Sequence, residues 1–255
     1  MKTNTFYLTL LSLCLNIHNY NAQEFIQELG ISAGPVSFRG DYGEKQDGET
    51  NLANTGIGVS LTHFLNFAYG RRSNSYFGKH FKVRSQLTYQ NASLEHKGSY
   101  IETNSDGAAK LNAMTGKVSS FEATTGLQWF YKRIRSYERS TNTFSPYAGV
   151  GAGAVFSSPS HESSLPGGID SPDNIFSTFR PDGDDAPISD DPETALAVNF
   201  QLGTQYRLRS NSDLYVELRF HFYSSDYVDG LSPIGDQNGA DDSSAWLAVG
   251  YLYYF

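Results

Sequence analysis

The sequence predicts an all-β protein, an eight-stranded antiparallel transmembrane β-barrel with short periplasmic turns and long extracellular loops. The first observation is the last strand, where Leu247, Val249, Tyr251, Tyr253 and Phe255 stand at every second position. A barrel wall meets lipid on one face only, so alternate side chains are apolar, and aromatic rings favour the membrane interface. An export signal at the other end of the chain and an alternation of short and long connections are the second and third observations.

Residues 1–22 are predicted to form a secretory signal peptide that is removed. Lys2 precedes an apolar stretch, residues 6–17, that is too short to span a bilayer, and the small residue Ala22 stands at a plausible cleavage site. Cys14, the single cysteine, lies in this segment, so we expect no disulfide or thiol chemistry afterwards. Residues 23–255 then form one barrel, integral to the bacterial outer membrane, with both termini in the periplasm.

Alternation of apolar and polar residues marks eight candidate strands. In chain order their alternating segments are residues 29–33, 57–67, 81–89, 121–131, 148–156, 196–206, 214–222 and 244–255. Pro35 is expected to mark a bend or a bulge. Connections after the odd-numbered strands are longer and mostly acidic, and the others are shorter and basic. This is the layout of an outer-membrane barrel, and an even strand number leaves no open edge in lipid.

Four stretches resemble a family of small outer-membrane barrels from flavobacteria and their relatives: ELGISAGPVSFRGDYG (28–43), NLANTGIGVSLTHFLNFAY (51–69), LNAMTGK (111–117) and FSPYAGVGAGA (144–154). The resemblance covers most of the chain after the signal peptide. It implies the barrel fold and the outer-membrane location, but it implies no activity. Some members of the family have been labelled glutamate dehydrogenase. This sequence does not support that label, because it has no G-x-G-x-x-G after a strand and no βαβ alternation.

Eight polar side chains fall on the predicted inner face of the barrel: Lys82, Arg84, Glu122, Gln128, Gln201, Glu217, Arg219 and His221. An eight-stranded barrel is just wide enough for side chains to fill it, and charges taken out of water must be paired. We therefore expect a hydrogen-bonded plug that neutralises its own charges. A narrow polar pore stays open as the alternative, because the glycine face of the fifth strand (Gly149, Gly151 and Gly153) makes local space.

The segment 157–193 is predicted to be a long acidic extracellular loop with six prolines. Loops of this length are functional or disordered more often than not. One interpretation is a solvated loop with no fixed ligand. A second is a docking surface for an outer-membrane partner, and a third is a Ca²⁺ site, although the spacing of the carboxylates lacks the EF-hand pattern. The residues that would carry the last two are Phe176, Phe179, Asp182, Asp184, Asp185, Asp190 and Asp191.

Composition and motifs narrow the class of function. The formal net charge of −8 argues against nucleic acid as a partner, because phosphate contacts need a basic face. The chain has no G-x-S-x-G nucleophile elbow, and His161 beside Glu162 sits in a serine-rich segment where chance pairings are expected. We therefore predict that the protein is not an enzyme, and we expect no cofactor other than the possible Ca²⁺.

The leading functional hypothesis is a structural or accessory subunit that presents acidic loops to a partner, either at the cell surface or within a larger outer-membrane protein complex. The alternatives are a narrow channel for small solutes or ions and, third, an outer-membrane hydrolase. Other expected partners are outer-membrane lipid, lipopolysaccharide and the barrel-assembly machinery during insertion. The assembly signal for that machinery would be the terminal aromatic residues Tyr251, Tyr253 and Phe255.

Overall fold

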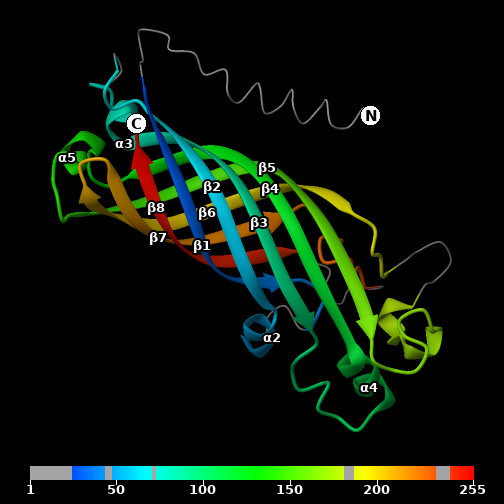
Figure 1. Ribbon diagram of the computed structural model, residues 1–255. Coiled ribbons are helices and arrows are strands. Elements are labelled where there is room, and N and C mark those ends of the chain that lie inside the picture. Colours follow the sequence, from blue (N-terminus) through cyan, green and yellow to red (C-terminus); the bar gives the residue numbers. More distant parts are fainter. Residues whose placement is uncertain (1–24, 44–47, 71–72, 181–186, 234–241) are drawn as a thin grey trace.

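The computed structural model describes residues 25–43, 48–70, 73–180, 187–233 and 242–255. Within them the chain forms a closed antiparallel barrel in which each strand pairs with the next and β8 pairs with β1 (Figure 1). The predicted fold class is therefore confirmed. The predicted signal peptide lies outside the described residues. The strands are β1 (Ile26–Arg39), β2 (Thr55–Asn66), β3 (Phe81–Glu95), β4 (Met114–Phe130), β5 (Phe144–Ser163), β6 (Glu193–Arg209), β7 (Ser212–Tyr223) and β8 (Ser243–Tyr254).

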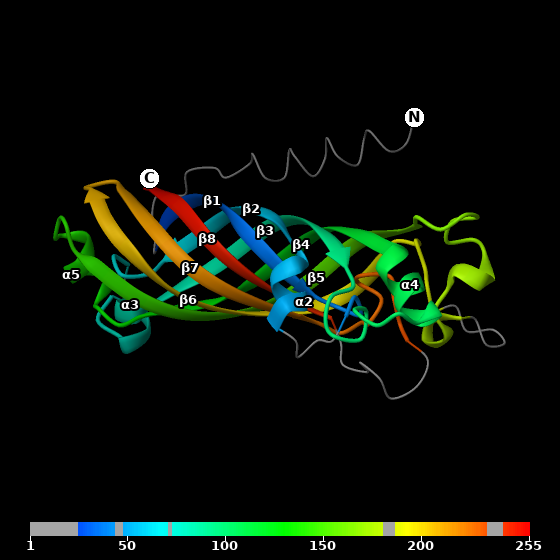
Figure 2. The same ribbon diagram turned by 90° about the horizontal axis from the view of Figure 1, so that it is seen from below.

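The two ends of the barrel differ. The turn end holds the connections 67–80, 131–143 and 210–211 together with Phe25 and the C-terminus, whereas the loop end holds the four other connections (Figure 2). Short helices lie at both ends: α3 (Tyr76–His80) and α5 (Ile134–Glu138) at the turn end, and α2 (Gly48–Ala53), α4 (Asp106–Ala113), η1 (Pro172–Asn174) and η2 (Ser177–Phe179) at the loop end. Ser75 and Ser105 cap α3 and α4 by accepting hydrogen bonds from backbone N–H groups.

No helix among the described residues is long and apolar enough to cross a lipid bilayer.

The wall of the barrel is apolar outside and polar inside, the reverse of a soluble protein. The outward positions of β7 show this plainly: Leu214, Val216, Leu218, Phe220 and Phe222 are all exposed, while the residues between them are buried. Each predicted strand has its faces as the alternation indicated. A continuous exposed apolar surface of this kind would be unfavourable in water, so it indicates that the wall is surrounded by lipid.

Three details of the strands differ from the sequence predictions. Pro35 causes no bulge: β1 keeps one register with β8 on both sides of it, and only the pairing of Gly34 and Pro35 is missing. Proline cannot donate to the ladder, so pairing is lost without a shift. The register shift lies instead between Arg207 and Arg209, where β6 reaches the turn end. In addition, β5 continues to Ser163, so the first seven residues of the predicted loop 157–193 are strand.

Strands β3, β4 and β5 rise beyond the rest of the barrel at the loop end (Figure 1). The β4–β5 ladder runs to the pair Met114↔Ser163, whereas β5 pairs with β6 only as far as Ser157. The outer side of this raised part carries exposed polar residues such as Ser93, Lys117 and Ser160 in place of apolar ones. The change marks where the wall leaves the region that lipid covers.

The assignment of faces can be tested at Leu218, which lies midway along the apolar outer face of β7, between Leu202 of β6 and Leu247 of β8. We expect Leu218→Arg to lower the free energy of unfolding by about 2–4 kcal/mol, because a cation at the bilayer midplane loses its hydration. Urea unfolding in vesicles measures the change. Ser93→Arg, on the raised part of β3, serves as the control and should change stability by less than about 0.5 kcal/mol. Equal effects of both substitutions would show that the faces are assigned wrongly.

Candidate functional site

The centre of the barrel holds a buried triad of charges from β3 and β7. Arg84 donates two hydrogen bonds to Glu217, at 2.6 and 2.9 Å, and Arg219 donates to the same carboxylate from the other side. Arg84 also donates to the side-chain oxygen of Gln128 at 3.1 Å, and the guanidinium of Arg219 lies 4.3 Å from the ring centre of Trp246. Two cations share one anion here, and the neighbouring carbonyl and indole stabilise the remaining positive charge.

A second cluster lies between the triad and the loop end. The ring nitrogen Nδ1 of His221 is 2.8 Å from Glu122 Oε2. Asn199 donates to Thr124 at 3.1 Å and to the other oxygen of Glu122 at 3.4 Å. These residues come from β4, β6 and β7, so the cluster joins strands that are not all neighbours in the wall.

A third cluster fills the lumen near the turn end. Lys82 Nζ lies 2.7 Å from the carboxylate of Glu28, and Glu138 of α5 lies 3.5 Å from the same nitrogen. Asn66 donates to both carboxylates, at 2.8 and 2.9 Å. Of these residues, only Lys82 was predicted from the sequence to face the lumen. Glu28 alternates with Leu29 and Ile31, so its inward position could have been found, whereas nothing in the sequence indicates that a turn residue such as Glu138 points into the barrel.

The predicted lumen residues all face the interior, and none is more than 3% exposed: Lys82, Arg84, Glu122, Gln128, Gln201, Glu217, Arg219 and His221. The glycines on the inner face of β5 lie close to neighbouring groups. A Cβ at Gly149 would lie 2.4 Å from the amide of Gln201, and one at Gly151 would lie 2.9 Å from Asn199. Gly149 and Gly151 therefore accommodate side chains from β6, whereas Gly153 lies against the backbone of β4.

An apolar cluster closes the loop end above the polar clusters. It includes Phe38 of β1, Tyr42 just after that strand, Leu94 of β3, and Ile175 and Phe179 from the long connection. Phe179 is 5% exposed, and Phe176 is partly buried against Gly107 of α4. This corrects the prediction of Phe179 as a partner-facing residue, because its ring is used to cover the barrel. We refer to this cluster with α4, η1 and η2 as the loop-end cap.

His96, just after β3, joins three segments of the loop-end cap. Its Nδ1 accepts a hydrogen bond from the backbone N–H of Gly43 at 3.0 Å, and its ring lies 4.9 Å from Tyr42 and 6.0 Å from Phe179. Burial lowers the pKa of His96 to about 3, since no charged partner offsets the loss of hydration. A protonated ring would have no acceptor for Gly43, so this packing requires the neutral form.

Of the acidic residues predicted to bind a partner or Ca²⁺, only Asp190 and Asp191 belong to the described part of the chain. Asp182, Asp184 and Asp185 lie outside the described residues. Asp191 is exposed, and Asp190 pairs with His161 at 2.7 Å. Among the described residues the structure instead brings together Asp41, Asp229 and Asp242, whose nearest carboxylate oxygens are within 4.8 Å of one another.

These three buried aspartates hold the connections at the loop end. Asp229 accepts hydrogen bonds from the backbone N–H groups of Asp41 and Leu231, at 2.7 and 2.9 Å, and Asp242 accepts one from Asp229 at 2.9 Å. Carboxylate oxygens also suit divalent cations. The backbone hydrogen bonds give the aspartates a structural role in joining the β1–β2 connection to the β7–β8 connection.

Within the described residues, His161 and Asp190 do not complete the catalytic group of three that the hydrolase alternative needs. His161 Nδ1 contacts Asp190, as a general base would contact an orienting carboxylate. Its other nitrogen, Nε2, has no hydrogen-bond partner in the described part of the chain, so no serine there is placed as a nucleophile. The ring stacks on Tyr42 at 5.9 Å. His161 thus belongs to the packing of the loop-end cap.

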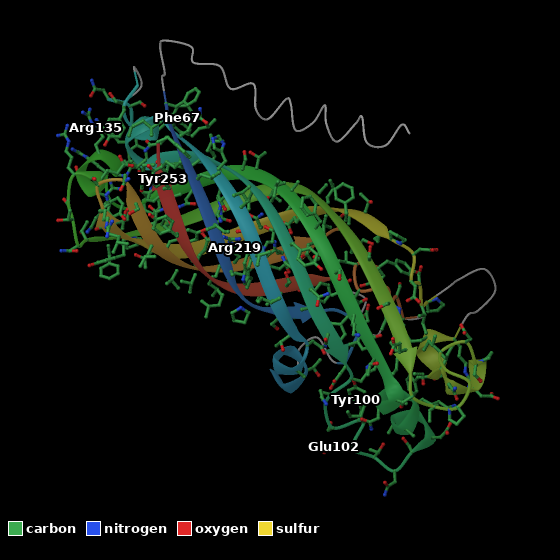
Figure 3. All side chains as sticks on the ribbon, viewed as in Figure 1. Phe67, Tyr100, Glu102, Arg135, Arg219 and Tyr253 are labelled. Carbon is green, nitrogen blue, oxygen red and sulfur yellow. The ribbon has the colours of Figure 1, made fainter. Side chains whose placement is uncertain are left out.

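The terminal aromatic residues lie on the outer face at the turn end. Tyr251, Tyr253 and Phe255 are 41%, 40% and 74% exposed, and the rings of the last two meet edge to face at 5.2 Å. Figure 3 shows Tyr253 with Phe67 and Arg135 at this end, Arg219 midway, and Tyr100 and Glu102 at the opposite end. The rings of Tyr251, Tyr253 and Phe255 are thus accessible at the surface. The role of these three residues as an assembly signal stays a prediction.

Comparisons with known proteins give likeness of structure only. No protein-family model matches the chain. No curated protein matches it. Among solved structures, Ail of Yersinia pestis, bound to a heparin analogue, is 14% identical over 91% of this chain and 99% of its own, with a TM-score of 0.44. A major outer membrane protein of Thermus thermophilus is 12% identical over 90% and 99%, also at 0.44. OprG of Pseudomonas aeruginosa is 14% identical over 91% and 97%, at 0.41.

We expect Glu217→Gln to lower the free energy of unfolding by about 3–5 kcal/mol, because Arg84 and Arg219 would then lack a counter-charge in a buried place. Urea unfolding measures the change. The control is Glu95→Gln, which breaks an exposed pair with Lys97 and should cost less than about 1 kcal/mol. If the two substitutions have similar effects, the central triad does not hold the lumen together.

The loop-end cap should loosen in acid because of His96. Because the pKa of His96 is lower in the folded protein than in the unfolded chain, the neutral ring stabilises the folded state fully above about pH 6.5. This stabilisation is lost as the pH falls from about 6.5 towards 3. The loss is at most about 1.4 kcal/mol per pH unit. Hydrogen-exchange protection of the Gly43 amide measures it, and His96→Asn is the matched variant because it keeps an acceptor that does not titrate. The same pH dependence in both proteins would assign the effect to another group.

Proposed function

We propose that this protein is an integral outer-membrane barrel with a structural or accessory role, which presents its loop-end cap to a partner protein. Two observations support this role: the outer wall is compatible with lipid, and the side chains inside the barrel pair with one another and stabilise the fold. It is a non-catalytic role, supported by the arrangement of His161 described above.

The filled lumen is the observation that carries the proposal. Buried ion pairs of Glu28 near the turn end and of Glu217 at the centre occupy the barrel, and the contact of Glu122 with His221 lies near the loop end. Apolar side chains then close both ends, with Ile134 and Tyr137 of α5 at the turn end and the loop-end cap at the other. Such an interior performs the task of a protein core. Its interactions with other molecules are then left to the two ends and the outer wall.

The acidic surface of the loop-end cap is the part offered to a partner. Buried residues of α4 and η2 pack on the barrel, which leaves the acidic residues of this surface outside on an ordered support. Electrostatic complementarity favours a partner with a basic surface, because charge steers encounter and excludes wrong partners. The exposed acidic residues of this surface are Glu102, Asp106, Asp170 and Asp173.

A narrow channel is the second candidate, and a specific observation favours it. Several buried polar atoms in the lumen have no hydrogen-bond partner among the described residues, including Gln86 Nε2, Gln90 Nε2, Gln201 Oε1 and Gln205 Oε1. Buried polar groups of this kind bind water. A chain of such sites would let small ions pass if the two ends opened.

Extraction of the tagged protein from its native membrane in mild detergent, with quantitative mass spectrometry, tests the proposal. We expect stoichiometric companions with the unaltered protein and their loss with the variant E102Q/D106N/D170N/D173N. The control E95Q/E162Q removes acidic residues from the raised part of the wall and should keep them. A barrel that is extracted alone, together with discrete conductance steps in planar bilayers, would overturn the proposal in favour of the channel.

A further inference from the structure

The turn end carries an exposed basic surface. Lys132, Arg133, Arg135, Arg139 and Arg209 are all exposed there. In the described turns at this end, the acidic side chains are directed inwards: Asp213 is buried, and the side chain of Glu138 is 6% exposed. The exposed ionic side chains of these turns are therefore all cationic.

The arginines of α5 are held on a fixed support. Ile134 and Tyr137 are buried in the barrel mouth, and the hydroxyl of Tyr137 donates to Asp213 at 2.9 Å. Because this face of α5 is fixed, Arg133, Arg135 and Arg139 project from its other side without further ordering. A basic group that is already positioned binds an anion at a lower cost in entropy.

An aromatic girdle places this surface at the edge of the lipid. Tyr69, Tyr76, Tyr131, Phe144 and Phe255 are exposed around the turn end. Rings of this kind lie at the level of the lipid headgroups. The guanidinium of Arg135 lies 5.1 Å from the ring centre of Tyr69, so this cation is at the same level.

We propose that the basic surface of α5 and its neighbouring turns binds the phosphate groups of anionic phospholipids. The chemistry is complementary, because a guanidinium donates two parallel hydrogen bonds to phosphate oxygens. Cations beside an anionic leaflet are attracted to it over about a Debye length. The turn end then faces a phospholipid leaflet and the acidic loop-end cap faces the opposite side. This inference rests on insertion in a membrane and not on the accessory role.

The test uses the full barrel in vesicles of phosphatidylcholine, with and without phosphatidylglycerol of the same chain length. We expect phosphatidylglycerol to raise the urea midpoint of the unaltered protein. The variant R133Q/R135Q/R139Q should lose this shift, and R133K/R135K/R139K should keep most of it. Raising the salt from about 0.1 M to about 1 M, which shortens the Debye length from about 10 Å to about 3 Å, should abolish the shift.

The control removes the same charge from the other end. The variant K97Q/K110Q/K117Q, with all three changes at the loop end, should keep the full shift. Equal loss in both glutamine variants would mean that net charge alone is responsible, and an undiminished shift in R133Q/R135Q/R139Q would remove α5 from the contact. Binding of soluble polyglutamate, with no dependence on phosphatidylglycerol, would show an acidic polymer as the partner. Each of these three results overturns the proposal.

Discussion

The pairing of charges inside the barrel is the constraint on which the rest of this structure depends. Lipid outside and a narrow lumen inside leave little water for an ionised side chain, so each charge must meet a partner. Arg84 and Glu217 are 133 residues apart in the chain, and their two hydrogen bonds cross the lumen from β3 to β7. A slip of one residue in either strand would turn these side chains towards lipid. The triad thus helps to fix the register of the wall.

Bulky interior side chains also demand space, and glycine on a facing or neighbouring strand provides it. The ring of Trp246 lies over Gly58, and that of Tyr147 lies over Gly203. Gly116 accommodates the ring of Tyr42 in the same way within the loop-end cap. A side chain at Gly58 would displace the ring of Trp246, which packs against the guanidinium of Arg219. Polar pairing and close packing are therefore one arrangement, as in the core of a soluble protein.

The sequence allowed most of the wall to be predicted, because lipid on one face imposes a period of two. The same alternation placed Lys82, Glu122 and His221 inside. The alternation did not predict strand where lipid is absent. Residues 157–163 of β5 lie beyond the lipid and need no apolar face, so their sequence resembles that of a loop. Helices of five or six residues are too short to show a period. The burial of Phe179 and the inward direction of Glu138 depend on contacts between distant segments, which no local pattern records.

The asymmetry of the two ends gives this architecture a direction. At the turn end, the acidic side chains of Glu138 and Asp213 point into the lumen and pair with Lys82 and Arg207. The arginines on and beside α5 therefore stay on the surface without these carboxylates between them and solvent. At the loop end the buried aspartates serve backbone N–H groups, while further acidic residues stay on the surface of the cap. Because buried groups need partners at both ends, the exposed charges that remain are cationic at the turn end and mainly acidic on the loop-end cap. A barrel whose interior is filled by paired charges still presents two chemically distinct surfaces, and electrostatic complementarity would favour a partner of opposite charge at each.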